Sequence, residues 1–398
     1  MVRTRQRSTT RASAQAEDPA VPPVKAKASP AKKVKTEKKA LPPTQSKVVN
    51  GRRMLFSLRD DDELLPATLI CRPSKRNKSP YVGDIELNHS APVKSGKQLP
   101  HPLVHLPNLD MGGKCRPNAQ LLVKPSRDRK GIKISASATG KFGTPKCQYS
   151  CQLLYVDESE DGLVEDTQAV PASSSQTRSK PTLYPPVWVG AHPSLGERIA
   201  EVWLREGLID GIPPVTKLER QITHPGGADM RADFLAVHAD HTRRIVEIKT
   251  VVDTDYAASH LPGHDLKCLF TSTQTPYQRT AIFPWGSSNQ KGPDGEKVVS
   301  ARAIHHVDEL ARLADGNLRE KNPQDGWDGT YLATLLFVVI RGDAAAFRPN
   351  HEACPSFAKH LAEARQRGVQ VLAKRVSWGI QEEEYGNCYD DVMLPVQW

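Results

Sequence analysis

Asp233, Glu247 and Lys249 are the residues whose types and spacing point most clearly to chemistry. Two carboxylates can hold a hard divalent cation such as Mg2+ or Mn2+, and a neighbouring lysine can orient or deprotonate an attacking water. The three residues therefore predict a metal-dependent nuclease site, with Asp233 and Glu247 as metal ligands and Lys249 as the catalytic lysine.

A β-hairpin must bring these residues together. Residues 231–238 and 245–250 are short apolar segments rich in β-branched residues, and the polar connector between them predicts a turn near residues 240–243. Side chains alternate along a strand, so the glutamate and the lysine share one face, which the aspartate can reach from the partner strand. The alternative is a solvated strand face, since Glu and Lys two residues apart are common on exposed strands. Apolar neighbours predict well-anchored strands and favour the catalytic interpretation.

Glu201 is a fourth candidate for this site, on a helix that precedes the hairpin. Ser194 and Glu197 have the spacing of a capping box, in which the serine accepts from the backbone three residues on and the glutamate reaches back. The helix that they open is expected to stop at Gly207. The alternative is that Glu201 is an ordinary surface glutamate.

The elements after this helix predict an α/β sandwich with a mixed sheet. Capping residues, turn residues and apolar periodicity give them in the order strand 217–223, the hairpin, helix 300–313, strand 331–340, a helix from Pro355 to Gly368 and strand 369–376. A segment rich in Gly, Pro, Ser and Thr, residues 256–298, is inserted in this order. A loop of that length inside a domain is usually a lid, a binding loop or disorder.

Residues 51–157 predict a separate all-β domain, because short apolar segments alternate with turns rich in Gly, Pro, Asn and Ser. A basic five-stranded barrel of the oligonucleotide-binding (OB) type fits this pattern. Two of its loops carry the side chains that we expect to bind nucleic acid: Lys75, Arg76 and Lys78, and Arg127, Arg129, Lys130 and Lys133. The alternative is that these residues only solubilise turns. Aromatic residues are sparse in this domain, so strong stacking on single strands is not predicted.

Three further segments are expected to lie outside the two domains. Residues 1–50 are rich in Lys, Arg, Pro, Ala, Ser and Thr and nearly free of large apolar residues, which predicts a disordered basic tail. This tail suits nuclear import or phosphate binding, and the alternative is a transit peptide for a plastid or mitochondrion. Residues 158–186 predict a linker, and residues 379–398 an acidic C-terminal tail.

Charge and cysteine content limit the classes of function. The chain has 398 residues and a net charge of +10, yet residues 151–398 carry 34 Asp and Glu against 25 Lys and Arg. A basic first part and an acidic second part predict that the first recruits a polyanion and the second handles cations. Seven cysteines without a CxxC pair indicate neither a zinc ribbon nor a disulfide framework, which favours a reducing compartment, nuclear or cytoplasmic. No apolar run is long enough to span a bilayer, so no membrane partner is expected.

About residues 70–376 resemble the sugar fermentation stimulation protein family (SfsA-like). The motifs that carry the resemblance are Tyr81–Asp84, Val104–Asn108 with Met111 and Gly112, Trp188–Gly190 with Leu195, Arg198 and Glu201, Arg231–Leu235, Val246–Lys249, Phe337–Asp343, Phe347–Pro349 and Gly368–Lys374. Their combination is specific, although no single motif is.

The resemblance implies an N-terminal OB-like barrel joined to a restriction-endonuclease-like domain of the PD-(D/E)xK class, here residues 187–378. The family is regarded as DNA-binding and is linked in bacteria to the regulation of sugar use. It implies the same roles for Asp233, Glu247 and Lys249, with Glu201 as the helix carboxylate. We therefore expect a nucleic-acid partner, DNA ahead of RNA. The protein is then either a Mg2+- or Mn2+-dependent nuclease or a DNA-binding regulator that performs no chemistry.

The chain departs from the family pattern in three respects. His192 stands where the family has an asparagine before the first helix, and His305 and His306 stand where it has a Lys-His pair. His305 could still contact a phosphate when it is protonated. The insertion at residues 256–298 and the basic tail are additions.

Overall fold

The computed structural model describes residues 46–88, 100–107, 111, 113–157, 185–259, 261, 268–323 and 326–398. Residues 1–45 of the expected basic tail and nearly all of the expected linker lie outside this part, as do Asn108 and Gly112. In the part that is described, no helix is long and apolar enough to cross a bilayer. The seven cysteines, all of them in the described part, form no disulfide bond with one another.

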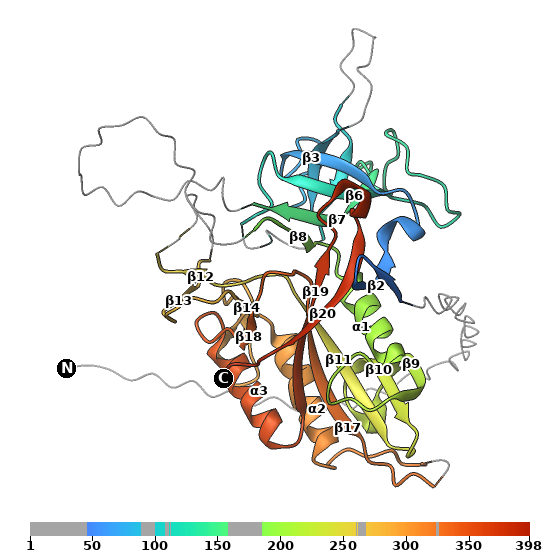
Figure 1. Cartoon of the computed structure of the whole chain (residues 1–398), viewed down its shortest axis with the longest axis vertical. Coiled ribbons are helices and arrows are strands. Elements are labelled where there is room, and N and C mark those ends of the chain that lie inside the picture. Colours follow the sequence, from blue (N-terminus) through green and yellow to red (C-terminus); the bar gives the residue numbers. More distant parts are fainter. Residues whose placement is uncertain are drawn as a thin grey trace, which may run out of the picture. The chain divides into compact units, whose positions relative to one another are not determined.

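Five strands form a closed barrel (Figure 1). They are β3 (Leu65–Cys71), β4 (Val82–Leu87), β5 (Leu103–His105), β6 (Gln120–Pro125) and β7 (Tyr149–Val156). Antiparallel pairs follow the order β5-β4-β3-β6-β7, and a parallel pairing between β5 and β7 closes the ring. The core includes Leu69, Ile85, Val104, Val123 and Leu154. The predicted five-stranded, OB-like barrel is therefore present.

The second large sheet has eight strands in the order β1-β2-β20-β19-β17-β11-β10-β9. Their bounds are β1 (Lys47–Val49), β2 (Arg52–Ser57), β9 (Val215–Thr223), β10 (Arg231–His238), β11 (Arg243–Val251), β17 (Leu332–Val339), β19 (Gln370–Trp378) and β20 (Asn387–Leu394). β11, β17 and β19 run parallel to one another, while the other neighbours are antiparallel. The sheet is therefore mixed, as predicted.

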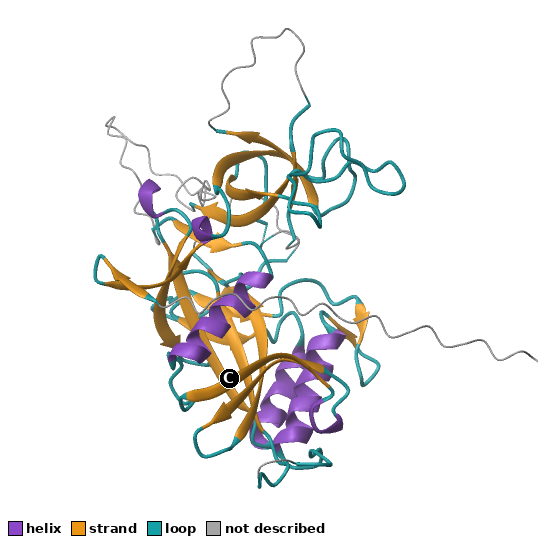
Figure 2. Ribbon diagram, turned by 90° about the vertical axis from the view of Figure 1, so that its right-hand side faces the viewer, coloured by secondary structure: helices purple, strands orange, loops and turns teal. Residues whose placement is uncertain are grey.

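Helices lie on both faces of this sheet (Figure 2). They are α1 (Ser194–Glu206), α2 (Ala301–Ala314) and α3 (Pro355–Gln366). Because strand side chains alternate, consecutive residues of β11 join different cores. Val246 lies in one core with Ile199 of α1, whereas Ile245 lies in the other with Leu310 of α2 and Phe357 of α3. The helices and strands predicted for this domain are present in the predicted order, and the structure adds further strands to them.

The helix α1 ends as predicted but begins differently. Gly207 follows it with φ 64°, a left-handed conformation that glycine adopts without steric cost. The predicted capping box is wrong, because Pro193 is the N-cap and no side chain caps the helix. The Ser194 hydroxyl instead lies 2.7 Å from Nδ1 of His192. The carboxylate of Glu197 therefore makes no cap.

Seven further short strands among the described residues lie outside the eight-stranded sheet and the five-stranded barrel, and five of them fall within the predicted insertion. They are β8 (Val187–Gly190), β12 (Tyr256–Ala257), β13 (Thr271–Ser272), β14 (Thr280–Phe283), β15 (Gln290–Lys291), β16 (Lys297–Val298) and β18 (Ala346–Pro349). β8 extends the barrel sheet beyond β7, although the sequence suggested that it opens the second domain. β14 pairs in parallel with β18, and this pairing anchors one part of the insertion to the α/β domain.

The eight-stranded sheet extends beyond the boundaries expected from the sequence. β2, expected in the barrel domain, and β20, expected in a C-terminal tail, pair with each other, and β20 also pairs with β19. Asp390 and Asp391 make this segment look like an acidic tail. In the fold, Asp390 accepts a hydrogen bond from the indole of Trp203 at 2.7 Å, and Asp391 forms an ion pair with Arg375 at 2.9 Å. These partners allow β20 to lie inside the sheet.

Candidate active site

The hairpin of β10 and β11 brings Asp233 and Glu247 to neighbouring positions. Phe234 pairs with Val246 in the antiparallel register, so the next positions along the two strands are Asp233 and Glu247. The Oδ2 atom of Asp233 accepts a hydrogen bond from the backbone N–H of Ile248 at 2.8 Å. This bond holds the aspartate carboxyl against β11.

Glu247 makes the central contacts of the site. Its side chain is 3% exposed, and its Oε1 atom accepts a hydrogen bond from Nζ of Lys249 at 2.7 Å. The same oxygen lies 2.5 Å from Nδ1 of His306 on α2. The second oxygen, Oε2, is buried and has no hydrogen-bond partner in the described part of the chain. A buried carboxylate oxygen without a partner is costly and calls for an explanation such as a bound ion.

The pKa values of the two carboxyl groups are shifted in opposite directions. Burial and the nearby charge of Glu247 raise the pKa of Asp233 to about 7. Burial also acts to raise the pKa of Glu247, but the hydrogen bond with His306 and the positive charge of Lys249 outweigh it, and that pKa is lowered. Near neutral pH, Glu247 is therefore ionised while Asp233 is partly protonated. Such separated proton affinities are typical of catalytic carboxyl pairs.

His306 is a site residue to which the sequence analysis assigned no role. The helix α2 directs its two adjacent histidines differently: His306 is 6% exposed and contacts Glu247, whereas His305 is 45% exposed and lies 2.8 Å from the backbone oxygen of Asp229. The apolar periodicity of α2 is the signal that could have found it. Residue 306 lies three residues after Ala303 and four before Leu310, on the buried face of the helix.

Glu201 does not contact the three residues of the hairpin. Its carboxylate forms ion pairs with Arg205 and Arg220, each at 2.9 Å. The structure therefore does not bring together all four predicted catalytic residues. Glu201 is instead bound by arginines of α1 and β9.

Glu197 is the carboxylate of α1 that lies next to the site. Its Oε2 atom lies 3.4 Å from Nε2 of Gln221, and the same amide nitrogen lies 3.4 Å from Oδ1 of Asp233. Gln221 has φ 57°, which is uncommon for a residue with a side chain. Backbone strain of this kind is found preferentially at functional sites. Gln221 thus links α1 to the carboxyl pair.

The basic residues of the two barrel loops differ in their partners. Arg127 and Lys133 form ion pairs with acidic residues that follow β2, and Arg76 donates to a backbone carbonyl. Asn77 donates to the carbonyl of Pro145 at 3.2 Å, which joins the first loop to the second. Four of the predicted binding residues have exposed side chains that contact no other side chain among the described residues. They are Lys75, Lys78, Arg129 and Lys130.

Asp233 and Glu247 are the residues that could hold a divalent cation. Among the described residues, no group of three His, Cys, Asp or Glu side chains is arranged to hold a metal. The two carboxyls, one buried and one half-buried, still provide oxygen donors, and one of these atoms has no partner in that part of the chain. Mg2+ commonly binds through one or two carboxylates and keeps several waters, so this donor set fits a hard cation.

Comparisons with known proteins agree on one family. A family model described as "Sugar fermentation stimulation protein RE domain" matches residues 293–382, a stretch that contains His306 but not Asp233, Glu247 or Lys249. The chain is 27% identical over 190 residues to a sugar fermentation stimulation protein homolog of Desulfotalea psychrophila, covering 48% of this chain and 59% of the relative. It is 28% identical over 185 residues to a homolog of Thioalkalivibrio sulfidiphilus, covering 46% and 58%. The chain thus spans less than two thirds of the length of these relatives.

A solved structure shares the fold. The structure of Pyrococcus furiosus SfsA in complex with Ca2+ is 15% identical in sequence, covers 87% of this chain and 99% of that chain, and has a TM-score of 0.50. The barrel, the family model and the curated relatives all agree with the motifs found in the sequence. In its motifs, in part of its sequence and in its fold, the chain is therefore similar to the sugar fermentation stimulation protein (SfsA) family.

Proposed function

We propose that this protein binds nucleic acid, DNA in preference to RNA, and hydrolyses phosphodiester bonds at Asp233, Glu247 and Lys249 with the help of a divalent cation. The arrangement of Glu247 supports this most strongly. One oxygen of this buried carboxylate contacts Lys249 and His306, and the other has no partner among the described residues. A second largely buried carboxyl lies beside it. The α/β domain, with its mixed sheet and carboxylate hairpin, would then be a restriction-endonuclease-like domain.

Asp233 and Glu247 would hold the cation, Mg2+ or Mn2+. When bound, it would polarise the phosphate and lower the pKa of a water. The raised pKa of Asp233 fits this role, because a positive ion at the pair would relieve the repulsion that contributes to the shift. The relative from Pyrococcus furiosus was solved with Ca2+, which also favours a divalent cation in this fold.

Lys249 and His306 would set the charge and the orientation of the site. The Lys249 ammonium is 13% exposed and lies 2.7 Å from Glu247, where it can also orient an attacking water. His306 holds the same oxygen of Glu247, and the other oxygen is left without a partner among the described residues. His306 therefore acts as a positioning residue, like the outer hydrogen-bond partners that orient metal ligands in other proteins.

The barrel would hold the nucleic acid. Lys75, Lys78, Arg129 and Lys130 project exposed charge from two loops that the contact between Asn77 and Pro145 joins. Such residues bind phosphates without sequence preference and make affinity depend on salt. We expect this basic surface to bind the backbone while the carboxylate site acts on one phosphate.

A cleavage assay tests the proposal. Purified protein is incubated with labelled single- and double-stranded DNA and RNA in Mg2+, Mn2+ or EDTA, beside Glu247→Gln and Lys249→Ala. Glu219→Gln, an exposed glutamate on β9, is the matched control. Cleavage by the wild type and the control, lost in EDTA and in both site variants, is the expected result. Equal cleavage by the site variants would contradict the assignment.

The second candidate is a DNA-binding regulator that performs no chemistry. The ion pair between Lys249 and Glu247, and the lack of a three-residue metal group among the described residues, favour this candidate. Binding without cleavage in either metal, unaltered by Glu247→Gln and Lys249→Ala, would support the regulator over the nuclease.

A further inference from the structure

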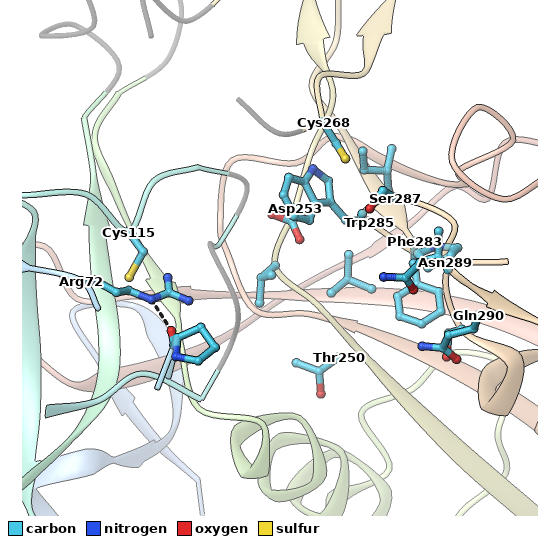
Figure 3. Close-up of a pocket in the computed structure, with 18 of the residues that line it drawn as sticks. Arg72, Cys115, Thr250, Asp253, Cys268, Phe283, Trp285, Ser287, Asn289 and Gln290 are labelled. Atoms are coloured by element: carbon cyan, nitrogen blue, oxygen red, sulfur yellow. Dashed lines mark hydrogen bonds between the residues drawn. The ribbon is translucent and has the colours of Figure 1, made fainter. Parts of the chain in front are cut away.

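A cavity of about 690 Å³ lies at the carboxyl end of β11. Four consecutive residues at this end, 250–253, line it, and β11 runs parallel to its neighbour β17. Ligands of α/β sheets commonly bind beyond the carboxyl ends of parallel strands. Figure 3 shows Arg72 and Cys115 of the barrel on one side of the cavity and Phe283, Trp285, Asn289 and Gln290 on the other.

The lining combines aromatic rings with side-chain amides. Trp285 is partly exposed, and its indole makes no hydrogen bond or ring contact with the described residues. Phe283 also lines the cavity but packs in the core against Phe337 and Phe357. The Asn289 amide is exposed and has no hydrogen-bond partner among the described residues. A flat aromatic ring with nearby amides suits a nucleobase, which stacks through its face and forms hydrogen bonds through its edge.

The cavity shares two elements with the carboxylate site. Its lining residues 250–253 follow Lys249 by one to four positions, and the two of them that belong to β11 lie about 3 and 7 Å further along the strand. Ser300 lines the cavity and caps α2, and His306 lies six residues further, about 9 Å along the helix. The cavity therefore lies within reach of a base on a strand that has a phosphate at the carboxylate site.

We propose that this cavity binds an unpaired nucleobase of the nucleic acid, with Trp285 as the stacking surface and Asn289 as a hydrogen-bond partner of the base edge. The inference rests on the proposed function, since it places a phosphate of the same strand at the carboxylate site. A base inside a duplex is already stacked and paired, so it must leave the helix to enter such a cavity. The substrate is therefore single-stranded nucleic acid, or a duplex with an unpaired or terminal nucleotide.

A binding titration without metal tests the cavity separately from catalysis. Deoxynucleoside monophosphates and a short single-stranded DNA are titrated in EDTA into the wild type, Trp285→Ala and Asn289→Ala. Trp398→Ala, at an exposed tryptophan outside the cavity, is the control. Loss of one stacking contact is expected to weaken binding roughly 5- to 150-fold in Trp285→Ala. Trp398→Ala is expected to bind like the wild type.

Each other outcome also has a defined meaning. Equal affinity of the wild type, Trp285→Ala and Asn289→Ala overturns the proposal, as does the lack of saturable binding of any monophosphate to the wild type. If Trp285→Ala fails to fold, the variant Asn289→Ala on the exposed loop tests the proposal instead. Weaker binding than that of the wild type supports the cavity, and equal binding overturns it. If base binding is lost in these variants but the wild type cleaves nothing in any metal, the cavity proposal stands and the nuclease proposal is rejected. If both variants still cleave nucleic acid and bind it with unchanged affinity, the nuclease proposal stands and the cavity proposal is rejected.

Discussion

At the scale of single residues, the carboxyl groups of Asp233 and Glu247 differ in what surrounds them. Glu247 has an ammonium group and an imidazole at one oxygen. Asp233 accepts one backbone hydrogen bond from Ile248 and faces the charge of Glu247. Folding therefore raises the proton affinity of Asp233 and lowers that of Glu247, and each shift changes the stability of the fold with pH.

Asp233 is expected to make the metal-free protein less stable as pH rises. Its pKa increases from 3.8 to about 7 on folding, so between these values the folded state binds more protons than the unfolded state. The contribution of Asp233 to the free energy of unfolding then falls as pH rises from about 4 to about 7, and levels off above that. Asp233→Asn cannot ionise, so above pH 7 we expect it to be more stable than the wild type by on the order of 2–4 kcal/mol. Urea unfolding in EDTA at pH 5 and pH 8 measures this, and a difference that does not change with pH would contradict it.

His306 and His305 provide a matched pair on one helix. His306→Ala removes a partner from the buried carboxylate of Glu247, so we expect the free energy of unfolding to fall by roughly 1–3 kcal/mol. We expect the cleavage rate to fall as well. His305→Ala alters an exposed neighbour and is expected to change stability by no more than about 0.5 kcal/mol. Urea unfolding of both variants gives the comparison, and equal stability of the two would show that the contact with Glu247 contributes nothing.

At the scale of elements, two loops of the barrel carry the charge expected to bind phosphates. The loop after β3 is held in shape by Asp84, which accepts hydrogen bonds from the Ser74 hydroxyl at 2.7 Å and from the backbone N–H of Lys75 at 3.1 Å. These bonds also help to lower the pKa of Asp84, although burial opposes them. A fixed loop presents Lys75 and Lys78 to a ligand at a smaller cost in conformational entropy.

The double variant Lys75→Ala/Lys78→Ala tests the role of this loop. If both lysines contact phosphates, the slope of log affinity against log salt becomes less steep by roughly 1.4 to 1.8, because each lost contact changes it by about 0.7 to 0.9. Lys359→Ala on α3, an exposed lysine of the other domain, is the control and is expected to keep the slope of the wild type. Fluorescence anisotropy across a salt series measures the slopes. An unchanged slope in the double variant would exclude this loop from the binding surface.

At the scale of the whole molecule, segments far apart in the chain complete one sheet. β20 lies between β2 and β19, and its Cys388 is buried in the same core as Phe56 and Trp378. The aromatic rings of Phe56 and Trp378 contact each other with centroids 6.4 Å apart. Neither end of the described chain is therefore dispensable for the α/β domain.

A chain that stops at residue 380 is expected to fail to fold, because it loses β20 and thereby the strand that joins β1 and β2 to the rest of the sheet. A chain that starts at residue 46 is the control, since it keeps every described strand and helix. We expect the control to melt within a few degrees of the full chain and the shortened form to be insoluble or to melt without cooperativity. Circular dichroism during heating tests both. Cooperative melting of the chain that stops at residue 380 would mean that residues 379–398 are a tail, as the sequence suggests.

Much of the local structure followed from the sequence. The turn near residue 240, the end of α1 at Gly207 and the start of α3 at Pro355 depend on neighbouring residues, and the structure agrees with each prediction. The spacing of Glu247 and Lys249 placed them on one face because strand side chains alternate. The capping box predicted from Ser194 and Glu197 shows the limit of such local rules. Pro193 occupies the N-cap position, and the expected side-chain hydrogen bonds are absent.

By itself, the sequence determined the order of elements, the barrel and the hairpin that carries Asp233, Glu247 and Lys249, because these follow from periodicity and turn residues within short windows. The tertiary structure decided which side chains meet across elements. It brought His306 of α2 to Glu247 and placed Glu197, in place of Glu201, beside the site. Such contacts depend on the register of strands and the packing of helices between segments far apart in the chain, which no local pattern specifies.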